Sequence, residues 1–358
     1  MPPKFRRKFI SYEPYESAAF IDVNGDGVLD IVSGAWWYEG PDYVAKHQID
    51  ELKQYGEYYD DFSTIAMDIN GNGRPDYVTG GWWGGTLRWR ENPGDPNARW
   101  PEHVIAQVGN VETTRAWDVD GCGLAEVVPN TPGQPLRYFK LVVDGKGKGQ
   151  GRFEEVVVSS RPQGHGLGAG DIAGHGRIDF VVPDGWYEAP ADPRKGEWVF
   201  HPDFQLMKSA SVPILVVDVN GDGVNEIIVG GGHQYGLDWW EQRLVGGKRT
   251  WIQHPIDPFN SQYHDMKWID VDGDGDCELV TGCRWRAHCG RDPGSADPYG
   301  IYYFKWNGEG FSKQIVIHGE AGQTKGLGIF FDVADLTGNG RPDLLAPGKD
   351  GLSIFYNE

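Results

Sequence analysis

Three histidines stand at related places in this sequence. His165 and His264 each lie six residues before the first aspartate of a short acidic motif. His233 lies fifteen residues after the first aspartate of another copy of that motif. Three neutral imidazoles and a water make a catalytic zinc site in many enzymes. If the fold brings these positions to one face, we expect zinc on His165, His233 and His264. The alternative for each histidine is a hydrogen-bonded structural role.

Other polar and aromatic side chains share this pattern. Glu112 also lies six residues before a motif, Asp265 follows His264, and the long insertion 284–300 carries His288 and Arg291. Tryptophans lie fifteen residues after the start of four motifs, at Trp37, Trp83, Trp186 and Trp285. A tryptophan ring can stack on the C–H face of a sugar, so we expect Trp37, Trp83 and Trp186 to bind a carbohydrate. The alternative is that they pack between sheets.

The acidic motif is Asp22-Val-Asn-Gly-Asp-Gly-Val-Leu-Asp30, and it has seven copies. We call them loops 1 to 7; they begin at Asp22, Asp68, Asp118, Asp171, Asp218, Asp270 and Asp335. Oxygens at positions 1, 3, 5 and 9 of such a glycine turn can converge on one calcium ion. The alternative is a turn held by hydrogen bonds alone. The expected calcium ligands are Asp22, Asn24, Asp26, Asp30, Asp68, Asn70, Asn72, Asp76, Asp218, Asn220, Asp222, Glu226, Asp270, Asp272, Asp274, Glu278, Asp335, Asn339 and Asp343. Loops 3 and 4 are poorer candidates, because Cys122, Ala173 and His175 replace ligands.

The elements that must position these residues are strands. Each motif lies between two short apolar runs, such as 18–21 and 31–32, which are typical of buried strands. The motifs recur every 46 to 65 residues, and two further strands follow in most units. Four strands per repeat predict a seven-bladed β-propeller that spans residues 1–358 as one domain. Residues 4–10 fit the pattern of a last strand, so we expect them to complete the seventh blade and close the ring.

Composition excludes several functions. The net charge of −19 disfavours nucleic acid and anionic membranes as partners. No apolar run approaches the length of a membrane-spanning helix. The start of the chain has no apolar signal region, which predicts a cytoplasmic protein, or a secreted or periplasmic one if a signal was removed. The four cysteines show no disulfide pattern, so free thiols are expected.

The loop repeats resemble the FG-GAP/VCBS class of seven-bladed propellers over nearly the whole chain. A closer resemblance lies in the second half, in Gly164-His-Gly-Leu-Gly-Ala-Gly-Asp171, Gly232-His-Gln-Tyr-Gly-Leu-Asp-Trp-Trp-Glu241, Gln262-Tyr-His-Asp265 and Ala287-His-Cys-Gly-Arg-Asp-Pro293. These segments are similar to the propeller domain of the aldos-2-ulose dehydratase family and its bacterial relatives. The resemblance implies dehydration of keto-sugars such as 1,5-anhydrofructose, with a zinc ion in the propeller cleft.

The sequence and this resemblance together predict a zinc-dependent lyase that removes water from a keto-sugar by β-elimination. Elimination needs a base for the α-proton and an acid for the departing hydroxyl. We expect His288 in one role and Glu112 or Asp265 in the other, with Tyr235, Arg291 and the tryptophans holding the sugar. One alternative is a non-catalytic, lectin-like propeller that holds calcium alone. A second is a polysaccharide lyase, with a local patch formed by Arg115, Arg284, Arg286 and Arg291.

Overall fold

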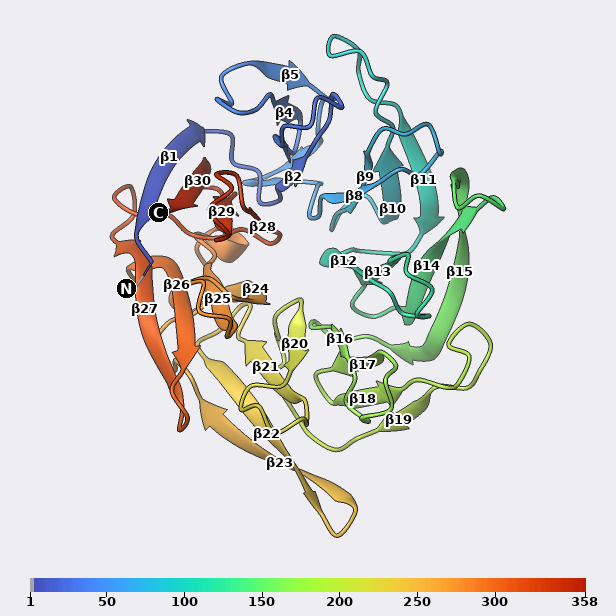
Figure 1. Ribbon diagram of the computed structural model, residues 1–358, viewed down its shortest axis with the longest axis vertical. Coiled ribbons are helices and arrows are strands. Elements are labelled where there is room, and N and C mark those ends of the chain that lie inside the picture. Colours follow the sequence, from blue (N-terminus) through green and yellow to red (C-terminus); the bar gives the residue numbers. More distant parts are fainter. Residues whose placement is uncertain (1–2) are drawn as a thin grey trace. The chain divides into compact units, whose positions relative to one another are not determined.

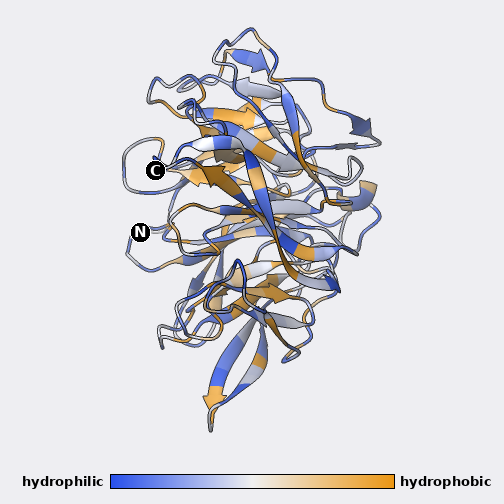
Figure 2. Cartoon of the chain, turned by 90° about the vertical axis from the view of Figure 1, so that its right-hand side faces the viewer, coloured by the Kyte–Doolittle hydropathy of each residue, from blue (hydrophilic) through white to orange (hydrophobic). Residues whose placement is uncertain are grey.

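The computed structural model describes residues 3–358, and this part of the chain is all-β. Its regular elements are strands β1 to β30 and one short 3-10 turn, η1 (Ala287–Cys289). The apolar runs on both sides of the acidic motifs form strands, as expected. Figure 2 shows hydrophobic residues concentrated on strands and hydrophilic residues on the connecting loops. None of the helical segments in residues 3–358 is long and apolar enough to cross a membrane.

The chain divides into two compact units. The first comprises the chain up to Ala116, Glu126–Val157 and Gly328–Glu358. The second comprises Trp117–Ala125 and Val158–Leu327. The three histidines of the expected zinc site all belong to the second unit, whereas Glu112 belongs to the first.

Four-stranded antiparallel sheets build the first unit. Their strands are β2 (Ala19–Ile21), β3 (Asp30–Ser33), β4 (Trp36–Tyr38) and β5 (Lys46–Gln48); β8 (Ile65–Met67), β9 (Asp76–Gly80), β10 (Thr86–Arg90) and β11 (Glu102–Gln107); and β28 (Asp332–Ala334), β29 (Asp343–Ala346), β30 (Leu352–Asn357) and β1 (Phe5–Ser11). A fourth sheet, most of whose residues are in this unit, contains β12 (Thr113–Trp117), β13 (Glu126–Asn130), β14 (Pro135–Val143) and β15 (Gly149–Pro162). A small hairpin joins β6 (Gln54–Tyr55) to β7 (Tyr58–Tyr59).

The second unit contains two groups of four strands that share one eight-stranded sheet, and a separate four-stranded sheet. The large sheet contains β16 (Gly168–Gly170), β17 (Asp179–Val182), β18 (Gly185–Glu188), β19 (Val199–His201), β20 (Ile214–Val217), β21 (Glu226–Gly230), β22 (Leu237–Val245) and β23 (Lys248–Pro255). Its halves meet where β16 and β20 pair in parallel. The other sheet contains β24 (Tyr263–Ile269), β25 (Glu278–Cys283), β26 (Tyr299–Trp306) and β27 (Phe311–Gly319).

The first strand of the chain is an outer strand of the last sheet. Strand β1 runs antiparallel to β30, with Phe5 opposite Asn357 and Lys8 opposite Ile354 (Figure 1). The backbone N–H of Glu358 also donates to the carbonyl of Lys4, at 2.9 Å. The expected pairing of the N-terminal segment with the last sheet is therefore present.

Every acidic loop joins the first strand of a sheet to the second, and hydrogen bonds hold it. In loop 1, Asp22 accepts the N–H groups of Gly25 and Gly27, at 2.8 and 3.0 Å. Asp30, at position 9, is completely buried and accepts the N–H of Val23 at 2.9 Å and that of Gly40 at 2.8 Å. Position 9 thus ties the loop to the sheet, a structural role that the sequence analysis did not foresee.

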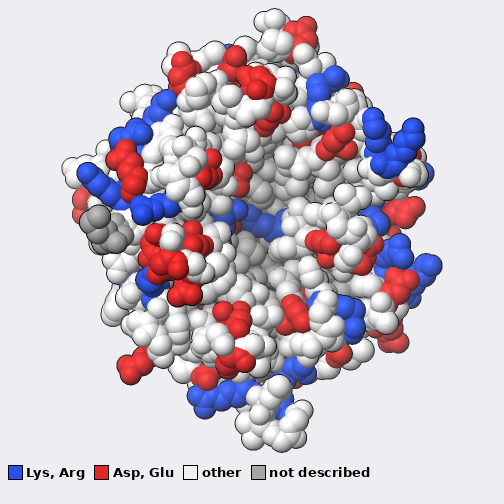
Figure 3. Space-filling model, in the orientation of Figure 1, with Lys and Arg blue, Asp and Glu red and all other residues white. Residues whose placement is uncertain are grey.

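The surface carries its acidic side chains in small clusters. Figure 3 shows several groups of Asp and Glu beside Lys and Arg on the face that it presents. All four cysteines, Cys122, Cys277, Cys283 and Cys289, are free thiols, as expected.

Candidate metal centre

The three histidines come from three neighbouring segments of the second unit. His165 precedes β16 and forms an isolated parallel bridge with Ser209. His233 lies in the turn between β21 and β22. His264 is the second residue of β24, and its carbonyl accepts the N–H of Val212 at 3.0 Å. Backbone hydrogen bonds between the segments thus hold the histidines in place.

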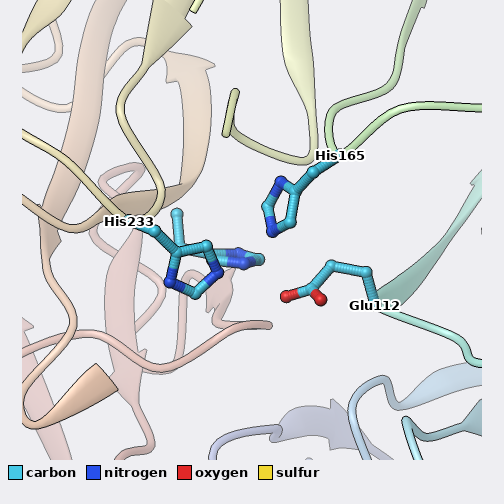
Figure 4. A group of neighbouring side chains, drawn as sticks. Glu112, His165 and His233 are labelled. Carbon is cyan, nitrogen blue, oxygen red and sulfur yellow. The ribbon is translucent and has the colours of Figure 1, made fainter. Parts of the chain in front are cut away.

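The structure brings the three imidazoles together. The ring centroids of His165 and His233 are 4.8 Å apart, those of His165 and His264 5.4 Å, and those of His233 and His264 5.6 Å. One nitrogen of each ring lies within 4.8 Å of a nitrogen of each other ring. Figure 4 shows His165 and His233 directed into the same space. This arrangement, predicted from repeat spacing alone, has the donor set of a catalytic zinc site.

Hydrogen bonds orient two of these rings for metal binding. Nδ1 of His165 faces the carbonyl of Ala210 at 2.8 Å, and because a carbonyl only accepts, Nδ1 carries the hydrogen. Nδ1 of His233 donates to Oδ2 of Asp292 at 2.7 Å. In both neutral rings the lone pair is then on Nε2. Zinc-binding histidines commonly donate their other ring nitrogen in this way, so the residues fit a zinc ion.

A glycine leaves room for the cluster. A side chain at Gly232 would begin 3.2 Å from Cδ2 of His264 and 3.4 Å from Cε1 of His165. The N–H of Gly232 also donates to the carbonyl of Ser209 at 2.8 Å. Even a methyl group there would crowd both rings.

The insertion 284–300 places a further histidine, His288, beside the cluster, where it pairs with His233. Oδ1 of Asp292 accepts from His288 at 2.8 Å while its Oδ2 accepts from His233. The rings of His233 and His288 stack, with centroids 4.2 Å apart and planes at 10°. Burial raises the pKa of Asp292, but the hydrogen bonds from His233 and His288 outweigh that effect and lower its pKa overall. The carboxylate therefore stays ionised between the two rings.

Backbone strain is concentrated around this insertion. Four of the five non-glycine residues with positive φ in the described chain are Gln262, Arg286, His288 and Cys289. Such conformations cost on the order of 1–3 kcal/mol each and are found mostly at functional sites. The strained turn holds the exposed His288 ring, whose side chain is 57% accessible, over His233. No pattern in the sequence indicates this geometry, because the strain depends on the folded loop.

The two carboxylates expected to act as base lie in different surroundings. Asp265 is buried beside His264, and its Oδ1 accepts the N–H of Met266 at 2.8 Å. Glu112 belongs to the first unit, where it is buried at the start of β12 and its N–H donates to the carbonyl of Asn130 at 2.9 Å.

Trp37 and Trp186, which the sequence analysis expects to bind a sugar, are buried in the structure. Both lie within third strands, β4 and β18, and are 3% and 0% exposed, because each stacks on a histidine of the next strand. Trp37 stacks on His47 and Trp186 on His201, each pair with centroids 4.2 Å apart. The alternative of packing within the fold applies to both.

Other predicted substrate-binding residues are accessible. Trp83 is 38% exposed and stacks on Tyr55 in the first unit, at 4.8 Å. In the second unit Tyr235 is 42% exposed, and its hydroxyl donates to Asp297 at 2.6 Å. Arg291 is exposed in the insertion that carries His288.

No protein-family model matches this sequence, and no curated protein matches it significantly. Among solved structures, 122 chains match. One is BBS1N, from a crystal structure of BBS1N in complex with ARL6DN, soaked with lead. It has 13% sequence identity and a TM-score of 0.52, over 99% of this chain and 97% of that one. At this identity the likeness shows the fold alone, and the protein has a β-propeller-type fold.

Proposed function

We propose that this protein is a zinc-dependent lyase that removes water from a keto-sugar of the 1,5-anhydrofructose or aldos-2-ulose type. The observation that carries the proposal is the convergence of His165, His233 and His264, since one ring nitrogen of each lies within 4.8 Å of the others. Zinc bound by three imidazoles polarises a carbonyl and stabilises negative charge on its oxygen. The neighbouring residues would supply the proton transfers.

His288 is well placed to move a proton. Its ring is exposed, and its Nδ1 is held by Asp292, so Nε2 faces solvent or substrate. A histidine held in this way can take the α-proton or protonate the departing hydroxyl. Asp265, beside His264, or Glu112 would take the complementary role. Tyr235 and Arg291 would hold the sugar ring or its hydroxyl groups.

We further propose the finer architecture that the repeats predict: seven blades of the FG-GAP/VCBS class, in which β1 completes the last blade and closes the ring. The four-stranded sheets and the pairing of β1 with β30 support it. Calcium in the acidic loops would stabilise the fold, and Asp22, Asn24 and Asp26 of loop 1 are one proposed ligand set.

One observation favours a lectin-like, non-catalytic role instead. Trp83 and Tyr55 form an exposed stacked pair, whose interplanar angle is 11°. Flat aromatic surfaces of this kind bind sugar rings without catalysis. The polysaccharide lyase has less support, because Arg115 and Arg284 are buried and cannot contribute to a surface patch for uronates.

Direct assay tests the leading proposal. The protein is stripped of metal, reloaded with zinc or left metal-free, and incubated with 1,5-anhydrofructose while enone absorbance is followed. We expect product only with zinc. Stoichiometric zinc without product from any keto-sugar, together with sugar binding, would favour the lectin-like role.

A further inference from the structure

The acidic loops differ in one position that lies outside the motif. In each sheet the register pairs the residue after position 9 of the loop with a residue of the third strand, such as Leu279 with Phe304 in the sheet of loop 6. One step further along the same ladder, position 9 comes opposite Glu39 in loop 1, Glu91 in loop 2, Glu188 in loop 4 and Glu241 in loop 5, but opposite Lys140 in loop 3, Lys305 in loop 6 and Tyr356 in loop 7. The position thus carries an acid in four sheets, a lysine in two and a tyrosine in one.

In loop 6 the lysine reaches the place where a cation is expected. Nζ of Lys305 lies 2.5 Å from Oδ2 of Asp272, 2.5 Å from Oδ2 of Asp274 and 3.2 Å from Oε1 of Glu278. These are positions 3, 5 and 9 of the loop, three of the four positions that would bind calcium. Hydrogen bonds to Asp272 and Asp274 raise the pKa of Lys305, so the amine stays charged.

Loop 3 shows the same substitution. Nζ of Lys140 lies 2.8 Å from Oε1 of Glu126, which is position 9 of that loop and is completely buried. Lys140 and Lys305 occupy the same register position in β14 and β26.

Where the position carries glutamate, the side chain brings no cation to the loop and faces a histidine of the next strand, and Glu91 also accepts from Asn70 of loop 2 at 3.0 Å. Glu241 accepts from His254 at 2.9 Å on the neighbouring strand and from Arg243 at 2.6 Å. Glu39, Glu91 and Glu188 likewise face His47, His103 and His201. In loop 5, position 9 is Glu226, and its Oε1 contacts the amide of Asn220 at 3.2 Å within the loop. No lysine stands opposite this glutamate.

We infer that the residue opposite position 9 decides which loops bind calcium: lysine closes loops 3 and 6 with its own ammonium, whereas glutamate leaves a loop open to the ion. The second half of this statement rests on the calcium loops proposed above; the first half rests on the contacts of Lys305 and Lys140. The sequence pattern alone favoured loop 6 as a calcium site, because all its ligand types are present. An ammonium held by three carboxylates supplies one positive charge at the place where calcium would supply two, and it cannot diffuse away.

The test counts calcium ions bound per chain by equilibrium dialysis of the full-length protein, with zinc already loaded. Asp274→Ala removes a ligand from loop 6, and its count should equal that of the wild type. Asp222→Ala is the matched change in loop 5, and it should lose one ion. Lys305→Met frees the loop 6 carboxylates and should gain one ion, with a melting temperature that falls in chelator and recovers in calcium.

The reciprocal change uses loop 5. Glu241→Lys puts an ammonium opposite Glu226 and should remove one bound ion. The control is Glu241→Gln, which loses the same contact with His254 but adds no cation, and it should keep the ion. Loss of an ion in Asp274→Ala, or an unchanged count in a folded Lys305→Met, would overturn the assignment of the lysine. A wild-type protein without calcium whose Lys305→Met variant gains one ion would reject the calcium loops and keep the lysine assignment.

Discussion

At the scale of single residues, His264 is the most enclosed member of the metal centre, with no exposed surface. Its ring would supply one of the three proposed zinc ligands, so His264→Ala should abolish zinc binding, measured by elemental analysis after dialysis, and with it enone formation. The protein should still unfold cooperatively, because the loops and strand ladders stay intact. His254→Ala, on an outer strand, is the control and should keep its zinc. Stoichiometric zinc in a folded His264→Ala variant would contradict the site.

Asp292 accepts hydrogen bonds from His233 of the metal centre and from the exposed His288. Its replacement therefore tests whether it positions His233. Asn at this position can accept from one histidine with its oxygen but presents an NH2 group to the other. We expect Asp292→Asn to weaken zinc affinity about 10–100-fold, the usual effect of losing such a partner. Competition with a zinc chelator measures this. Asp297→Asn, in the same insertion but bonded to Tyr235, should bind zinc like the wild type; equal affinities in all three proteins would show that Asp292 does not position His233.

A buried carboxylate in the first unit gives a pH-dependent stability. Burial raises the pKa of Asp61 to about 6, although the nearby Arg88 and Arg90 lower it. Because this folded-state pKa is above the unfolded value, the folded state binds more protons, and stability is lost as pH rises from about 4 to about 6. The loss attributable to Asp61 is on the order of 3 kcal/mol.

Asp61→Asn should therefore stabilise the protein more at pH 7.5 than at pH 4.5, since Asn is never charged. Urea unfolding of both proteins at the two pH values measures the difference. A stabilisation of equal size at both pH values would show that Asp61 has an ordinary pKa in the folded protein.

At the scale of elements, β1 should be essential to the last sheet. Without it, the outer edge of β30 would lose its hydrogen-bonding partner, from Phe5 opposite Asn357 to Ser11 opposite Leu352. A protein that starts after Ile10 should melt at a distinctly lower temperature and tend to associate through the exposed edge. Calorimetry and light scattering test this. An unchanged melting temperature would mean that β1 adds nothing to the sheet.

The strands and the convergence of the histidines could be predicted because both follow from periodicity. Apolar runs fix the strands, and equal offsets from repeated loops place His165 and His264 at equivalent positions. An offset does not say which way a side chain turns. For this reason the sequence could not show that Trp37 and Trp186 pack on histidines of the next strand. Asp292 contacts His233, which is 59 residues away in the sequence, and Lys305 contacts Asp272, which is 33 residues away. No local sequence pattern predicts such contacts.

At the scale of the whole molecule, calcium should stabilise several loops at once. Ligands that bind only the folded state raise its stability by mass action. A chelator selective for calcium should lower the melting temperature of the wild type, and added calcium should restore it, whereas magnesium, which prefers a smaller octahedral site, should restore it less. Identical melting curves in chelator and in calcium would mean that hydrogen-bonded turns suffice.

Because β1 pairs with β30, the chain could also be circularly permuted. Lys4 and Glu358 are hydrogen-bonded neighbours, so a short linker can join them without disturbing a strand. New ends can then be opened at Gly246 and Gly247, in the exposed turn of the β22–β23 hairpin. A circular permutant of this kind would begin and end inside one hairpin, and its break would fall between His233 and His264 but outside every acidic loop. Such a protein could carry a fused partner at the hairpin tip.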